Sequence, residues 1–124
     1  MNVLELDILK REREYWLALL IDSKEIILRD DSNAIVLKEL VNSLNGTGAY
    51  LIFTCSCGIA DCGGWEMIDV IYEKNSVNWI FCYNNVNYDF RFDHAFYKGE
   101  IERILFEIKR RKIELSPKHL IFPE

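Results

Sequence analysis

The sequence lacks any long apolar run, and this absence narrows the classes of protein it can belong to. The longest apolar run in the first part of the chain, Tyr15 to Ile21, has seven residues, about a third of what a membrane-spanning helix needs. The first ten residues are acidic rather than basic. We therefore expect neither a signal peptide nor a membrane span, and we expect a cytoplasmic protein with mostly reduced cysteines.

Motifs of the common enzyme classes are also missing. The sequence has no phosphate-binding loop, nucleophile elbow or His-Glu-x-x-His pattern, and no internal repeat or linker. Of its 2 histidines, His94 could act as a general base for a cysteine. A single histidine at a strand–helix junction is more often structural, so we expect a protein that is not an enzyme and has no catalytic residues.

Positive charge is scarce outside one segment. The 124 residues carry 15 Lys and Arg against 20 Asp and Glu, a net charge of −5. Residues 98–112 hold six of these bases and three of the acids, so the rest of the chain sets nine bases against seventeen acids. Such a surface repels nucleic acids and anionic membranes and attracts a basic protein. The basic run at 109–112 is expected to end a helix, where cations complement the helix dipole.

The densest group of special residues lies between Tyr50 and Trp65, where three cysteines are interspersed with three glycines. A tight turn can bring the sulfurs of Cys55, Cys57 and Cys62 to one tetrahedral metal ion, and the glycines permit the positive φ angles of such a turn. A closed zinc site has four ligands. The candidates for the fourth are Cys82, His94 and His119.

Two other interpretations of this stretch remain open. The cysteines can be reduced turn residues that pack as small hydrophobes. They can also have a redox role, in which Cys57 and Cys62 are the more favourable disulfide pair, because a bond between Cys55 and Cys57 on one strand would be strained. No cofactor is required by the sequence, and zinc is the one candidate.

Residues 3–28 fit two secondary structures. The alternation of apolar and acidic residues from Leu4 to Ile8 predicts a strand, but the apolar residues of this region also fit one face of a helix. We favour strands, because the apolar run that follows has strand length and a polar turn separates it from the next apolar segment. The predicted strands are 3–10, 14–21 and 25–28.

The rest of the chain predicts two helices and further strands. Apolar residues recur at helical spacing over 33–44, with Ser32 or Asn33 as the N-terminal cap and Gly46 suited to a left-handed C-terminal cap. A second helix is expected with Asp93 as its N-terminal cap and with its apolar stripe centred on Leu105. Strands are predicted at 65–72, 77–83 and 88–92, with Trp79, Phe81 and Tyr83 on one face and Ile80 and Cys82 on the other.

These elements predict a single α+β domain over residues 1–124. Half of the residues are hydrophobic and 13% are aromatic, which is enough for one core. The apolar face of the strands must be covered, and the two amphipathic helices are available to cover it. We expect an antiparallel sheet of about six or seven strands with two helices packed on one face.

The segment Leu51-Ile-Phe-Thr-Cys-Ser-Cys-Gly-Ile-Ala-Asp-Cys-Gly-Gly64 resembles a motif of small, poorly characterised bacterial proteins. In that family a strand ending in Thr-Cys-x-Cys-Gly is followed by a further cysteine and a second strand. Residues 77–79 and 92–97 resemble the family's later strand and the start of its last helix. The resemblance covers about residues 50–103 and implies an α+β sheet protein, with no particular chemistry.

Three classes of function are compatible with these features. The first is an acidic binding protein that neutralises a basic partner, such as an immunity protein that inhibits a bacterial toxin. The second is an interaction module stabilised by zinc, and the third is a cysteine-dependent redox protein. We favour the first, with a basic protein as partner. The candidate contact residues are acids in turns and on strand faces away from the helices: Asp30, Asp31, Asp61, Glu66, Asp69 and Glu73.

Overall fold

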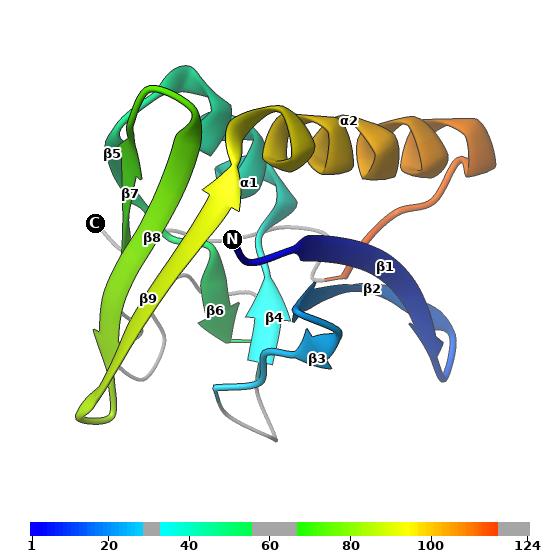
Figure 1. Cartoon of the computed structure of the whole chain (residues 1–124). Helices are drawn as coiled ribbons and strands as arrows, with labels where there is room; N and C mark the ends of the chain where they lie inside the picture. Colours follow the sequence, from blue (N-terminus) through cyan, green and yellow to red (C-terminus); the bar gives the residue numbers. More distant parts are fainter. Residues whose placement is uncertain (29–32, 56–66, 117–124) are drawn as a thin grey trace.

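The computed structural model describes residues 1–28, 33–55 and 67–116, and this part of the chain has nine strands and two α-helices (Figure 1). The predicted α+β class with two helices is confirmed. The elements in chain order are β1 (Leu4–Arg11), β2 (Glu14–Ile21), β3 (Lys24–Glu25), β4 (Asn33–Ile35), α1 (Leu37–Asn42), a 3₁₀ turn (Ser43–Asn45), β5 (Gly48–Tyr50), β6 (Phe53–Cys55), β7 (Ile68–Tyr72), β8 (Ser76–Tyr83), β9 (Val86–Asp93) and α2 (His94–Arg111).

The described strands form three antiparallel sheets, where the sequence predicted one. The orders are β5-β7-β8-β9, β1-β2-β3 and β4-β6. An isolated bridge connects the first two sheets, since the N–H of Asn2 donates to the carbonyl of Arg91 at 2.7 Å. The side-chain oxygen of Asn2 also accepts from the N–H of Arg91 at 2.8 Å. Edge strand β1 is thereby tied to edge strand β9.

The N-terminal region is a hairpin, and the helical alternative is wrong. Strands β1 and β2 confirm the predictions at 3–10 and 14–21, while the third strand is only Lys24–Glu25 rather than 25–28. The register pairs Leu4 with Ile21 and Leu6 with Leu19. All four side chains are buried, so this register directs one apolar face of the hairpin into the core.

The helix predicted at 33–44 starts later than expected. Residues Asn33–Ile35 form strand β4, and α1 begins only at Leu37. Asn33 is not the helix cap, because its side-chain oxygen accepts a hydrogen bond from the N–H of Leu28 at 3.0 Å. Pairing of β4 with β6 overrides the helical spacing. The segment ends at Gly46, whose φ of 129° is open to glycine but lies outside the usual left-handed helical cap.

The β8–β9 hairpin has the predicted alternation. The two turn residues, Asn84 and Asn85, have φ of 54° and 64°. A two-residue hairpin turn of type I′ requires positive φ at both positions. The faces of β8 are as predicted: the aromatic residues point inward and are buried, and the residues between them are at least partly exposed. The inward residues are Trp79, Phe81 and Tyr83, and the outward ones include Ile80 and Cys82.

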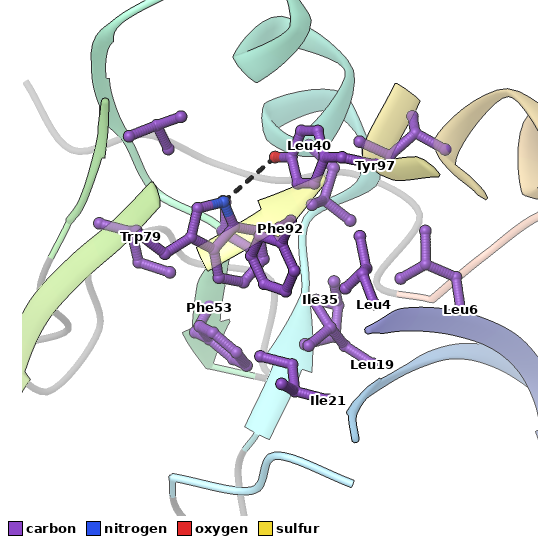
Figure 2. Packing of buried hydrophobic residues seen from close by; sticks show 14 of the residues in the cluster. Leu4, Leu6, Leu19, Ile21, Ile35, Leu40, Phe53, Trp79, Phe92 and Tyr97 are labelled. Carbon is purple, nitrogen blue, oxygen red and sulfur yellow. Dashed lines mark hydrogen bonds between the residues drawn. The ribbon is translucent and has the colours of Figure 1, made fainter. Parts of the chain in front are cut away.

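The hydrophobic core lies between the four-stranded sheet, the β1–β2 hairpin and α2 (Figure 2). The rings of Trp79 and Phe92 meet edge to face, with centroids 5.1 Å apart. Helix α2 covers this core and contacts β1, β8 and β9. Its fully buried residues are Tyr97, Ile101 and Ile104.

Two details of α2 can be compared with the sequence. The predicted cap is confirmed, since a side-chain oxygen of Asp93 accepts from the N–H of Phe96 at 3.0 Å. The predicted centre of the apolar stripe is wrong, because Leu105 is only half-buried whereas Ile101 and Ile104 are at most 1% exposed. The helix is turned so that the Ile101–Ile104 side faces the core.

A chain of hydrogen bonds crosses the core beneath α2. The indole N–H of Trp79 donates to the hydroxyl of Tyr97 at 3.2 Å (Figure 2). The hydroxyls of Tyr97 and Ser43 are 2.6 Å apart, and Ser43 donates to the carbonyl of Leu40. Tyr97 therefore donates to Ser43, and each of these three buried side chains, Trp79, Tyr97 and Ser43, has a hydrogen-bond partner. The chain joins β8, α2 and the end of α1.

Candidate binding surface

The outer face of the four-stranded sheet is exposed across all of its strands. The register places Ala49 of β5, Asp69 of β7, Ile80 of β8 and Asp89 of β9 side by side in one row. All four side chains are exposed, and that of Ile80 is 41% exposed. An isoleucine is thus held in solvent between two carboxylates, because its neighbours on β8 point into the core.

Further apolar side chains adjoin this row. Ile71 is diagonal to Ile80 on the neighbouring strand and is 36% exposed, and Cys82 follows Ile80 two residues later on the same face. Diagonal neighbours on one sheet face are within reach of each other. We call Asp69, Ile71, Ile80, Cys82 and Asp89 the sheet-face patch.

The two carboxylates of the sheet-face patch have no partner among the described residues. The side chains of Asp69 and Asp89 make neither a hydrogen bond nor an ion pair within these ranges. Glu73, the other described candidate from the sequence, differs: Arg91 donates to it at 2.8 Å and Asn78 at 2.9 Å. Among the described residues of this face, the two aspartates therefore carry the negative charge that is open to a partner.

Sequence reasoning named Asp69 and missed Asp89. The alternation of aromatic residues with Asp89 and Arg91 along β9 carried the necessary signal, because it places Asp89 on the solvent face. The remaining candidate contact acids lie outside the described residues: Asp30, Asp31, Asp61 and Glu66.

The candidate metal ligands that the structure describes are dispersed. Cys55 ends β6 and packs against the core, whereas Cys82 points to the outer face of β8. His94 is the first residue of α2, and its ring meets that of Tyr72 edge-on, with centroids 5.4 Å apart. In the described ranges no group of three or more metal-binding side chains forms. The other candidate ligands, Cys57, Cys62 and His119, lie outside these ranges.

Next to Cys55 on β6 lies a buried hydroxyl, that of Thr54, with no hydrogen-bond partner among the described residues. Thr54 is 0% exposed, and its side-chain oxygen has no hydrogen bond to any residue in the described part of the chain. Burying such a group without a hydrogen bond is unfavourable. Sequence reasoning did not identify this residue.

Replacing Thr54 with valine should raise the free energy of unfolding by about 1 kcal/mol. Valine has nearly the same shape and lacks the unpartnered hydroxyl, so the packing stays while the desolvation penalty disappears. Urea denaturation of the two proteins measures the change. Replacing Ser43, whose hydroxyl is fully hydrogen-bonded, with alanine is the control and should destabilise. A loss of stability in the Thr54 variant would contradict the prediction.

A shallow groove of about 420 Å³ lies between β1 and the first half of α2. At its floor the N–H of Leu6 donates to Glu100 at 2.7 Å, and Arg103 donates to the carbonyl of Leu6. Burial opposes ionisation of Glu100, but the hydrogen bonds from Arg103 and Leu6 outweigh it and hold the pKa of this carboxyl below its usual value. Two side chains thus occupy the open edge of β1 and block pairing with another strand there.

No helix of the described residues is long and apolar enough to cross a bilayer. Comparison of the chain with known protein families, curated proteins and solved structures finds no match. The resemblance of residues 50–103 to small bacterial proteins therefore stays a prediction.

Proposed function

We propose that this protein is a non-enzymatic, acidic binding protein that neutralises a basic bacterial toxin by direct contact, as an immunity protein does. The sheet-face patch is the observation that supports this proposal most. It combines an exposed apolar centre, Ile71 and Ile80, with two carboxylates that have no partner in the described part of the chain, Asp69 and Asp89.

Each part of the patch has a separate role in binding. The apolar centre supplies surface that a partner can remove from water, which holds a complex together. The carboxylates attract a basic partner during its approach and reject an acidic one. The basic segment 109–112 belongs to the end of α2 that points away from the four-stranded sheet (Figure 1), so it does not cancel this attraction.

Reversing both aspartates to lysine, Asp69→Lys with Asp89→Lys, should slow association with the toxin about tenfold and change dissociation much less. The wild-type association rate should also fall as salt rises from about 50 mM to about 500 mM, because salt screens exposed charges. The partner in the measurement is the basic product of a neighbouring gene, and the readout is surface-based binding kinetics.

A matched control has the same change in net charge at another place. Glu12→Lys with Glu25→Lys changes two exposed acids, one in the β1–β2 turn and one in β3, and should leave the association rate close to that of the wild type. Ile80→Ala should instead speed dissociation, since apolar contacts form after the encounter. An association rate that does not change with salt would contradict the proposal that the sheet-face patch binds the partner. Equally slow association of both double variants would contradict it too.

A further inference from the structure

Helix α2 exposes an apolar strip on the side opposite the core. Ala95, Gly99 and Phe106 follow one another at helical spacing on the face opposite Ile101 and Ile104. The side chain of Phe106 is 65% exposed. A side chain built at Gly99 would meet nothing within 4 Å, so this surface is open. Phe106 lies in the C-terminal half of α2, and its exposed ring would be removed from water if another surface packed on it.

Two unpartnered charges of opposite sign flank this strip. Glu102 and Lys109 are seven residues apart, which is two helical turns, and they lie on the same flank with Phe106 between them. Both are exposed, and within the described residues neither has an ion-pair partner. The other exposed pairs of α2 are satisfied within the helix: Arg103 with Glu100 at 2.8 Å and Arg110 with Glu107 at 2.8 Å.

We propose that the outer face of α2 is a self-association surface, on which α2 of a second copy packs antiparallel about a two-fold axis at Phe106. Such an axis brings the two Phe106 rings together. It also sets Glu102 of each copy against Lys109 of the other, because the same flanks face each other when two helices run in opposite directions. The same surface of both copies is then complementary to itself, as a two-fold symmetric interface requires.

The antiparallel direction follows from the charge along α2. Its last turn carries Lys109, Arg110 and Arg111, and a parallel arrangement would place the two basic ends side by side with their helix dipoles aligned. The antiparallel arrangement instead places each basic end beside residues 100–103 of the other copy, where Glu100 and Arg103 pair with each other and Glu102 adds a negative charge.

The expected dimer is weak. The overlap of two α2 helices centred on Phe106 runs from Ile101 to Arg111, or about 16 Å of helix, and buries less surface than a stable complex usually does. The dissociation constant should therefore be on the order of 100 μM. The sheet-face patch takes no part in this contact, so self-association and toxin binding succeed or fail independently.

Sedimentation equilibrium from about 10 μM to about 1 mM tests the proposal. The mass of the wild-type protein should rise from 14.6 kDa toward twice that value. Phe106→Asp should stay monomeric because it buries a charge at the axis. Ile80→Asp, an equivalent change on the sheet face, is the matched control and should associate like the wild type.

A charge swap tests the geometry itself. Glu102→Lys sets two pairs of like charges against each other and should weaken association at least tenfold, and Lys109→Glu should do the same. The double variant Glu102→Lys with Lys109→Glu restores opposite charges and should recover association. A wild-type protein that stays monomeric, a Phe106→Asp variant that still associates, or a double variant as weak as the single ones would overturn the proposal.

Discussion

Replacing Ile104 with alanine is expected to lower the free energy of unfolding by about 2–5 kcal/mol. The side chain is 1% exposed and belongs to the core cluster beneath α2. It packs among side chains from several elements, so the surrounding structure can relax only partly into the cavity that alanine leaves. Urea denaturation gives the change, with the midpoint shifted and the slope preserved.

Two neighbouring variants make this expectation specific to the orientation of α2. Leu105→Ala should cost clearly less, because Leu105 is half-buried at the edge of the core. Arg110→Ala should change stability by less than about 0.5 kcal/mol, because the pair of Arg110 with Glu107 is exposed. Equal effects of the Ile104 and Leu105 variants would mean that the helix faces the core differently.

Removing the hydroxyl of Tyr97 with Tyr97→Phe is expected to cost about 1–3 kcal/mol at neutral pH. This hydroxyl is the central member of the chain from Trp79 to Ser43. Without it the indole N–H of Trp79 is left in the core without an acceptor, which is the unfavourable case for a buried polar group. Thermal or urea denaturation measures the loss.

The same variant should change how stability depends on pH. Burial raises the pKa of the Tyr97 phenol well above its ordinary value of 10.0, and the hydrogen bond that it accepts from the indole N–H of Trp79 only partly opposes this shift. Above about pH 10 the unfolded chain therefore releases a proton that the folded chain keeps, so the stability contributed by the neutral phenol is lost as pH rises. One such group lowers the free energy of unfolding by up to about 1.4 kcal/mol for each pH unit above this value.

The measurement is the free energy of unfolding between about pH 8 and about pH 11, where the unfolded tyrosine begins to ionise. The difference between the wild type and Tyr97→Phe should narrow as pH rises. A difference that stays constant with pH would show that the Tyr97 phenol ionises as easily in the folded protein as in the unfolded one.

Several features of the site and fold depended on contacts that the sequence does not display. The alternation along β9 predicts that Asp89 is exposed. In contrast, the charge of Glu73 is neutralised by Arg91, which is eighteen residues away in the sequence. The cover over the edge of β1 depends on Glu100, separated from Leu6 by ninety-four residues. Local patterns predict which face a side chain is on, and they do not predict its partner.

The sequence alone determined the α+β class, the strands of the β1–β2 and β8–β9 hairpins and the cap at Asp93, because these follow from apolar spacing and capping chemistry within a few residues. The tertiary structure alone decided that 33–35 is a strand, that Ile104 rather than Leu105 faces the core, and that the strands divide among three sheets. The physical reason is that a short segment has comparable free energy as helix or strand, so the pairing with β6 and the packing under α2 select between them.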